Sequence, residues 1–477
     1  MSAEWKTYRL EQLDIIFEDG DRSSRYPKAS EYLKCGKHPF INTRNIVNNQ
    51  LDWTDVNFIP DEKFSSISKG RVSPSDILIS TRGSKLGKTA YYTFHPWKQP
   101  LINAQLLIIR CNDEKVEAKY LWHLLSSAEG QQQINSLKSG SAQPQLPVRD
   151  LKKFEVTLPS RELQRMVVTV MDSIDEKSSL NTKINQTLEQ MAQAIFKSWF
   201  VDFEPVRAKM NVLEAGGSEQ DALLAAMQAI SGKDADQLVL FQTEQPEQYA
   251  ELKTTAELFP SAMQDSELGE IPEGWEVLPL SKMINLIGGG TPKKSEPSYW
   301  DGSICWFSVK DAPSEGNIFV IDTEEKITDA GLKGSSTKLL PIGTTIITAR
   351  GTVGKLALTG VVTAMNQSCY GVVGNDGTGP YLNYLRLHKA VDTLKRNTHG
   401  AVFDTITRAT FETVVQPQAC LELRQRFEEV VEPIFKTIKT SLHQIQTLSE
   451  LRDPLLPKLL SGELTFEPSE DNEVAIA

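Results

Sequence analysis

Apolar side chains recur at intervals of three and four residues in two long stretches of the chain, 160–203 and 419–464. The first stretch carries them at Leu163, Val167, Val170, Ile174, Ile184, Leu188, Met191 and Ile195. The second carries them at Phe427, Val431, Ile434, Ile438, Ile445, Leu448 and Leu455. This spacing places each set along one face of a helix, close to the seam of a coiled coil. We therefore predict one long helix in each stretch, with these residues as the pairing surface.

Both predicted seams become polar near their middle. Asn181 lies there in the first stretch and Ser441 in the second, and the tripeptide Gln-Thr-Leu occurs in both, at 186–188 and 446–448. A polar residue at a seam position fixes helix register at some cost in stability. A helix of about 40 residues spans roughly 60 Å, which is longer than the helices of an ordinary core. The two helices are therefore expected to pack on each other and hold two similar bodies apart.

The regions that precede these helices, 1–159 and 274–418, repeat each other in pattern. Each opens with a tryptophan and contains short strands rich in Ile, Val and Thr that are broken by Gly and Pro, which favours a mixed α/β body. The predicted fold class is α+β, with two such bodies, two long helices and a pseudo-twofold internal repeat. Region 204–273 has no counterpart and is predicted to be an acidic connector, helical or partly disordered. Region 465–477 is predicted to be a disordered acidic tail.

The net charge of −11 is unevenly distributed along the chain. Region 204–273 carries a net charge of −10, whereas 1–150 carries +3 and 274–420 carries +1. A local basic surface on either body is therefore compatible with the acidic total. The five cysteines are scattered without a Cys-x-x-Cys pair, and no run of 18 apolar residues occurs. A zinc site, a disulfide framework and a membrane span are not expected, and the cytoplasm is the expected compartment.

A glycine-rich segment that carries basic residues follows a β-branched strand in each body. The first contains Arg82, Lys85 and Lys88, and the second contains Arg350 and Lys355. Neither has the spacing of a phosphate loop between its first Gly and the Gly-Lys that follows, so a nucleotide site is not expected. A glycine hairpin lets the backbone approach a polyanion closely, and Arg can bind phosphate or guanine through two hydrogen bonds. The alternative is an ordinary charged surface hairpin.

Polar residues elsewhere in the two bodies are further candidates for DNA contact. They are the basic residues Arg44 and Lys310, the amides Asn103, Gln105, Asn366 and Gln367, and the loop residues Ser141 and Gln143. Amides can bind adenine through two hydrogen bonds, but they also cap turns and satisfy buried backbone groups. The sequence leaves these two roles equally open.

The sequence shows no credible catalytic centre. Asp311, Glu324 and Lys326 have the composition of a metal-dependent nuclease site, but Asn45 takes the place of Asp311 in the first body, so we interpret them as loop charges. The six histidines are isolated, and no Gly-x-Ser-x-Gly nucleophile elbow occurs. The Asn/Asp-Pro-Pro-aromatic tetrapeptide needed for base methylation is also missing. We expect neither a metal ion nor a cofactor in this chain.

Several longer strings point to a known family. They are the tryptophans Trp5 and Trp275, GGTP at 289–292 with YWDG at 299–302, the two basic hairpins, FKSWFVDF at 196–203 with PVR at 205–207, ELGEIPEGW at 267–275 and LLPKLLSGE at 455–463. With these features, nearly the whole chain resembles the specificity subunit of a type I restriction–modification system. The first body departs from the second, because Glu-Asp-Gly-Asp at 18–21 stands in place of Gly-Gly-Thr-Pro.

The resemblance implies two target recognition domains on an antiparallel intramolecular pair of long helices. Each domain would bind one half of a split double-stranded DNA site, and the helix pair would fix the spacing. Because the two domains differ, the site would be asymmetric. The outer surfaces of the helices would be available for docking other subunits.

The resemblance also implies partners and their cofactors. Two modification (adenine methyltransferase) subunits would bring S-adenosylmethionine, and restriction subunits would bring ATP- and Mg²⁺-dependent motor and nuclease activity. This chain would be non-catalytic in a system that defends against foreign DNA. The alternatives are a methyltransferase or nuclease fused to its own recognition domain, and an interaction scaffold without a DNA role.

Overall fold

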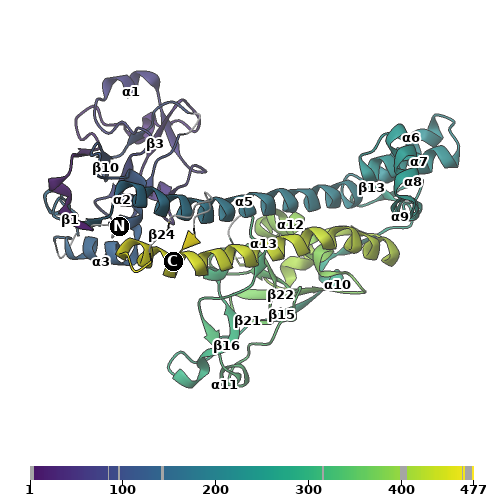
Figure 1. Cartoon of the computed structure of the whole chain (residues 1–477). Helices are drawn as coiled ribbons and strands as arrows, with labels where there is room; N and C mark the ends of the chain where they lie inside the picture. The colour runs from purple at the N-terminus through teal and green to yellow at the C-terminus, as the bar shows by residue number, and fades with distance from the viewer. Residues whose placement is uncertain are drawn as a thin grey trace. The chain divides into compact units, whose positions relative to one another are not determined.

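The computed structural model of the chain contains two compact units (Figure 1). The first comprises residues 1–176 and 448–477, and the second comprises 177–447. The structure describes residues 5–83, 85–94, 97–140, 144–313, 316–397, 405–464, 466–467 and 475–476. Each unit contains one body and a part of both long helices, so the division falls within the helices and not where they begin.

The first body is built around a four-stranded sheet in which every neighbouring pair is antiparallel. Its order is β2 (Ile15–Asp19), β10 (Leu106–Cys111), β7 (Ile77–Ser80) and β8 (Thr89–Tyr91). A three-stranded sheet orders β6 (Asn57–Ile59), β3 (His38–Ile41) and β9 (Leu101–Ile102), and β1 (Lys6–Arg9) pairs with β11 (Glu155–Leu158). The other elements are β4 (Ile46–Val47), β5 (Gln50–Leu51), α1 (Asp61–Ser66), α2 (Ala118–Ser126), α3 (Ala128–Ser136) and α4 (Val148–Leu151). Strand β7 is buried on both faces, which explains its continuous apolar sequence.

The second body repeats this architecture. Its main sheet has the order β15 (Ile284–Gly288), β22 (Cys369–Gly374), β19 (Thr345–Thr348), β20 (Leu356–Thr359) and β17 (Phe319–Val320). A three-stranded sheet orders β18 (Lys326–Ile327), β16 (Trp300–Phe307) and β21 (Thr363–Met365), and β14 (Glu276–Pro279) pairs with β23 (Val415–Gln418). The helices of this body are α10 (Leu280–Met283), α11 (Asp329–Lys333) and α12 (Pro380–Arg396). The repeat predicted from the sequence is therefore present in the order of the strands.

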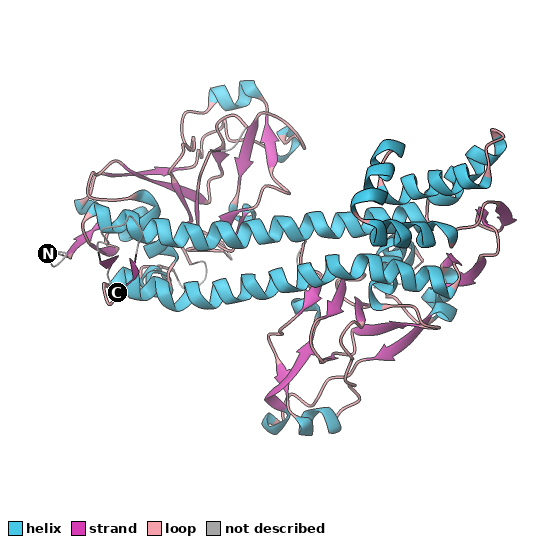
Figure 2. Cartoon of the chain, turned by 45° about the vertical axis from the view of Figure 1, so that its right-hand side comes forward, coloured by secondary structure: helices cyan, strands magenta, loops and turns pink. Residues whose placement is uncertain are grey.

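Two long helices, α5 (Arg161–Phe200) and α13 (Leu421–Ser461), follow the two bodies. Within the second unit they run antiparallel (Figure 2). The rings of Phe196 and Phe427 lie 6.2 Å apart, whereas Asn181 Nδ2 donates to Gln444 Oε1 at 3.1 Å. Higher residue numbers on α13 therefore lie opposite lower residue numbers on α5, as expected for antiparallel helices. Ser441 Oγ also donates to the backbone oxygen of Asn181 at 3.4 Å, so the two polar seam positions meet.

The buried face of α5 differs from the predicted seam in its second half. Ile184 is 39% exposed and Met191 is 49% exposed, so neither is a core seam residue. The fully buried positions are one residue later, at Asn185 and Ala192. The prediction from apolar spacing did not include Asn185, which is polar, or Ala192, which is small. It chose the larger apolar residues Ile184 and Met191, which lie at the edge of the buried face. On α13 the same displacement makes Phe435 fully buried beside a partly buried Ile434.

Region 204–273 is folded, and of the two predicted alternatives the structure has the helical one. It forms α6 (Glu204–Glu214), α7 (Glu219–Ser231), α8 (Ala235–Glu244), α9 (Pro246–Glu257) and the hairpin of β12 (Met263–Ser266) with β13 (Gly269–Pro272). Ala226, Met227, Leu238 and Ala256 form a small core between the helices. Val206, Phe259 and Ile271 join the larger core of the second unit, and Ser218 and Asp234 cap α7 and α8 through reciprocal side-chain bonds.

In the acidic tail, the described residues form β24 (Phe466–Glu467) and β25 (Ala475–Ile476), which pair antiparallel. The rest of the predicted disordered tail lies outside the described residues.

Candidate nucleic-acid interface

A glycine hairpin joins β7 to β8 in the first body and carries two exposed basic side chains. Gly87 donates its N–H to Ser80 O at 2.8 Å. Gly83 and Gly87 have φ angles of 85° and 89°, a left-handed conformation that favours glycine. The side chains of Arg82 and Lys88 are exposed, and neither forms an ion pair with a residue that the structure describes. Both cations are therefore available to an external anion.

Lys85, the third basic residue of this hairpin and also a predicted DNA-contact candidate, forms hydrogen bonds within the protein. Its Nζ donates to Arg44 O at 3.1 Å and to Ile46 O at 2.9 Å, so it fastens the hairpin to the turn after β3. Arg44 lies in that turn with half of its side chain exposed, and its Nη1 is 3.6 Å from Asp55 Oδ2. The structure thus brings Arg44 next to the hairpin, and Lys85 holds the two together.

The turn between β9 and β10 lies beside the same hairpin, because Thr81 N donates to Gln105 O at 2.9 Å. Asn103 is buried, and its Oδ1 accepts from Gln105 N at 3.1 Å, which caps the turn. Gln105 is exposed, and its Oε1 accepts from Thr43 Oγ1 at 3.5 Å. The sequence left open whether these amides cap turns or contact DNA. Asn103 caps the turn, whereas the exposed amide of Gln105 remains accessible.

The second body presents a matching pair of free cations. The hairpin between β19 and β20 has Gly351 and Gly354 at φ angles of 80° and 81°. Arg350 and Lys355 flank these glycines, are exposed, and form no ion pair within the described part of the chain. Each body therefore exposes one Arg and one Lys, neither of them ion-paired with a described residue, from a glycine hairpin at the same place in its sheet.

The amide turn of the second body also lies next to its hairpin. Ser368 O accepts from Ala349 N at 2.7 Å and from Arg350 N at 3.2 Å. Asn366 Oδ1 accepts from Ser368 N at 2.9 Å, so Asn366 caps the turn as Asn103 does. Gln367 is exposed and accepts a hydrogen bond from Thr291.

The last described candidate, Lys310, follows β16. Its side chain is 80% exposed, and its Nζ lies 3.8 Å from Glu324 Oε2. Ser141 and Gln143 lie outside the described residues. Gln145, which is described, forms a backbone bridge with Arg82 of the first hairpin.

Gly20 and Gly289 occupy equivalent places in the two bodies, and the sequence analysis did not recognise this equivalence. A Cβ on Gly20 would lie 2.2 Å from Asn103 O, and a Cβ on Gly289 would lie 2.0 Å from Asn366 O. Only glycine fits against these turns. The shared constraint was missed because the residues around the two glycines differ.

A basic residue follows each of these glycines, and both are ion-paired, Arg22 with Asp19 and Lys294 with Glu325. Arg22 Nη2 donates to Ala104 O at 3.3 Å, directly in the amide turn of the first body. Lys294 Nζ lies 4.0 Å from the ring centroid of Trp300 in the second body, a cation–π contact. The signal in the sequence was a basic residue shortly after the glycine in both halves.

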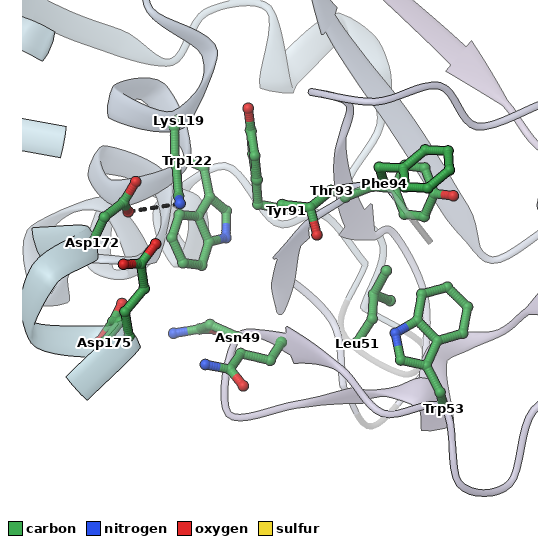
Figure 3. A pocket seen from close by; sticks show the side chains of 13 residues that line it. Asn49, Leu51, Trp53, Tyr91, Thr93, Phe94, Lys119, Trp122, Asp172 and Asp175 are labelled. Carbon is green, nitrogen blue, oxygen red and sulfur yellow. Dashed lines mark ion pairs between the residues drawn. The ribbon is translucent and has the colours of Figure 1, made fainter. Parts of the chain in front are cut away.

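The first unit also has a cavity of about 250 Å³ near α5 (Figure 3). It is lined by Asn49, Gln50, Leu51, Trp53, Tyr91, Tyr92, Thr93, Phe94, Lys119, Trp122, Asp172, Asp175 and Glu176. Lys119 Nζ lies 2.6 Å from Asp172 Oδ1, and burial raises the pKa of Asp175. Three carboxylates in one wall repel phosphate, so this cavity is not where a DNA backbone would bind.

Neither a metal centre nor a membrane helix is found in the described part of the chain. No three His, Cys, Asp or Glu residues there gather as ligands, and no helix there combines the length and apolarity needed to cross a bilayer. Asp311 caps its own turn, accepting from Ser308 N at 2.8 Å, while Lys326 pairs with Asp322 at 3.0 Å. Asp311 thus ends a short turn, and Lys326, predicted to be a loop charge, begins strand β18; each has a structural partner.

The family model for the type I restriction modification DNA specificity domain matches residues 2–190 and 272–415. The chain belongs to this family. The matched segments cover both bodies and most of α5, so both glycine hairpins lie inside specificity-domain sequence.

Relatives of the specificity family align along the whole length. The HindI specificity subunit of Haemophilus influenzae is 30% identical over 97% of this chain and 100% of its own length. The MjaIX specificity subunit of Methanocaldococcus jannaschii is 24% identical over 97% of this chain and 94% of its own. The crystal structure of a type I system S subunit from M. genitalium shares the fold, with a TM-score of 0.52 at 13% identity and 96% coverage of both chains.

Proposed function

We propose that this specificity subunit recognises an asymmetric, bipartite double-stranded DNA site, with one body for each half-site. The observation that carries the proposal is the pair of matching surfaces. Arg82 and Lys88 in the first body, and Arg350 and Lys355 in the second, are exposed, unpaired within the described residues and held on glycine hairpins. Exposed cations of this kind neutralise phosphates and position a protein on the duplex.

Residues beside the hairpins supply the differences needed for two distinct half-sites. Gln105 and Gln367 keep exposed amides, which can bind base edges in the major groove. The first body adds Arg22 to this surface, whereas the second adds Lys294 on Trp300. Because the two surfaces carry different side chains around their hairpins, the two half-sites are expected to differ.

The chain is a non-catalytic subunit, so chemistry on DNA has to come from partners. We infer that two modification subunits bring S-adenosylmethionine, and that restriction subunits bring ATP- and Mg²⁺-dependent activities, in the cytoplasm. The flank of α5 supports docking: Leu180, Ile184 and Met191 are 51%, 39% and 49% exposed on the helix surface of the second unit. Apolar side chains in such a row are typical of a surface that another helix covers.

A domain exchange tests the proposal directly. Residues 1–159 would be replaced by the matching region of the Haemophilus influenzae relative, and the methylated bases would be mapped in cells that express the modification subunit. We expect one half of the methylated site to change and the other to remain. A change in both halves would contradict the assignment of one body to each half-site. A gel shift with modification subunit alone is the control, and it should show no specific binding.

A further inference from the structure

A second cavity, of about 410 Å³, lies within the second unit. The end of α5, the β12–β13 hairpin, α12 and β23 enclose it, and its walls are largely apolar. The main apolar contributors are Phe196, Phe200, Phe203, Leu268, Ile271 and Val414. None of the DNA-contact candidates lines this cavity.

A buried arginine lines this otherwise apolar space. Arg386, from the middle of α12, is only 2% exposed, and its Nη1 and Nη2 have no hydrogen-bond partner within the described residues. No carboxylate there forms an ion pair with it. Its neighbour Arg424 adds a like charge and cannot compensate it; Arg424 itself donates to Asp376 O at 3.0 Å and to Thr378 Oγ1 at 2.6 Å. Burial, followed by the charge of Arg424, lowers the pKa of Arg386 to about 9.

An unpaired buried guanidinium is unfavourable for the isolated chain, because desolvation of the charge is not offset by a counter-ion. A ligand that carries an anion into the cavity would remove this cost. Lys389, almost one turn further along α12, is exposed at the cavity and offers a second cation. The cavity therefore combines an apolar wall with two cations of which one is deeply buried.

We propose that this cavity receives an acidic side chain of a modification subunit, whose carboxylate pairs with Arg386 and Lys389 while neighbouring apolar side chains contact the phenylalanines. The inference rests on the proposed function, because it names the docking site of a proposed partner. It adds a second contact to the flank of α5 and explains why Arg386 is held without a counter-ion in the free chain.

A carboxylate fits this cavity better than a phosphate group. The α12 residues that line the cavity lie in the middle and C-terminal half of that helix, so the N-terminus of α12, where a phosphate group would be favoured, is not part of the cavity wall. Glu270 also lines the cavity and would repel a dianion. The phenylalanine walls match the apolar neighbours of a protein side chain more closely than a hydrated phosphate.

The test compares Arg386→Met, Lys389→Ala and the wild-type chain in their affinity for the modification subunit. Lys253→Ala is the charge-matched control, because Lys253 lies on α9 and does not line the cavity. We expect Arg386→Met to weaken binding at least about tenfold, and Lys389→Ala by about threefold. We also expect Arg386→Met to raise the melting temperature of the free chain, since it removes an unpaired buried charge.

The outcomes separate this inference from the proposed function. If the wild-type chain binds the modification subunit and both variants bind equally well, the acidic contact is wrong while the docking partner stands. If the wild-type chain does not bind at all, both are wrong. A lower melting temperature of Arg386→Met with unchanged affinity would show a structural role. Inorganic phosphate that stabilises the wild-type chain but not Arg386→Met, with unchanged complex affinity, would assign the cavity to a small oxyanion and overturn the proposal. If Arg386→Met does not fold, the affinities of Lys389→Ala and Lys253→Ala for the modification subunit are compared instead. Equal affinities would then overturn the proposal.

Discussion

The two free cations of the first hairpin allow a quantitative prediction about DNA binding. We expect the double variant Arg82→Ala, Lys88→Ala to weaken binding by the complex with its modification subunit, and to reduce the salt dependence of that binding. Because both side chains are exposed and form no ion pair with a described residue, their removal should leave the fold intact. The loss of affinity would then report only on DNA contact.

The size of the effect follows from counterion release. Each phosphate contact contributes about 0.9 to the slope of log affinity against log salt concentration. Loss of two contacts should reduce the slope by about 1.8. Between about 50 and about 200 mM salt, the ratio of wild-type to variant affinity should therefore fall roughly twelvefold.

The assay is a fluorescence titration of a labelled duplex carrying the recognised site, repeated over this salt range. Arg9→Ala is the control for loss of one positive charge, because the Arg9 guanidinium is already paired with Glu155 at 3.3 Å. The exchange Arg82→Lys, Lys88→Arg keeps both charges and should keep the slope. An unchanged slope in the double alanine variant would refute the assignment of this hairpin to phosphate contact.

Replacement of Lys85, on the same hairpin, is expected to lower stability and to leave the salt dependence of DNA binding unchanged. Its Nζ donates to two backbone oxygens, at 2.9 and 3.1 Å, so Lys85→Met leaves two acceptors without their partner. We expect the free energy of unfolding to fall by about 1–3 kcal/mol, measured by urea denaturation. A variant with unchanged stability but a reduced salt slope would show that Lys85 contacts DNA after all.

Three further predictions concern the helices and α2. A seven-residue insertion at matched places in α5 and α13 adds about 10.5 Å, so the spacer of the recognised site should lengthen by roughly three base pairs; an unchanged spacer in a functional complex would contradict the spacing role. Asn185→Leu should raise the unfolding free energy by about 1–3 kcal/mol in urea denaturation, because both polar atoms of this buried amide lack partners among the described residues, and a loss of stability would contradict this. Burial lowers the pKa of His123 to about 3, so folded protein binds no proton there while the unfolded chain does. Stability should then fall as pH drops below about 6.5, by up to about 1.4 kcal/mol per pH unit, and urea denaturation of His123→Phe should show a shallower dependence; equal profiles would refute it.

Local periodicity was sufficient to predict the large elements. The two long helices and the repeated strand order follow from spacings that each segment carries within itself. The glycine hairpins were likewise visible, because a left-handed turn demands glycine at the turn itself. The exposed state of Arg82 and Lys88 agreed with their place in such a turn.

Packing partners distant in the chain decided the rest. Ile184 is exposed and Asn185 is buried because the opposing α13 determines which face of α5 is covered, and apolar character alone does not encode this. Lys85 differs from Lys88 only through two carbonyl oxygens that lie about 40 residues earlier. In the sequence, Arg386 cannot be distinguished from an exposed arginine. Only the residues packed around it show that its charge is buried without a counter-ion among the described residues. The sequence alone determined the helices, strands and turns, whereas the neighbours of each side chain were set by tertiary contacts, since burial and pairing depend on residues far away along the chain.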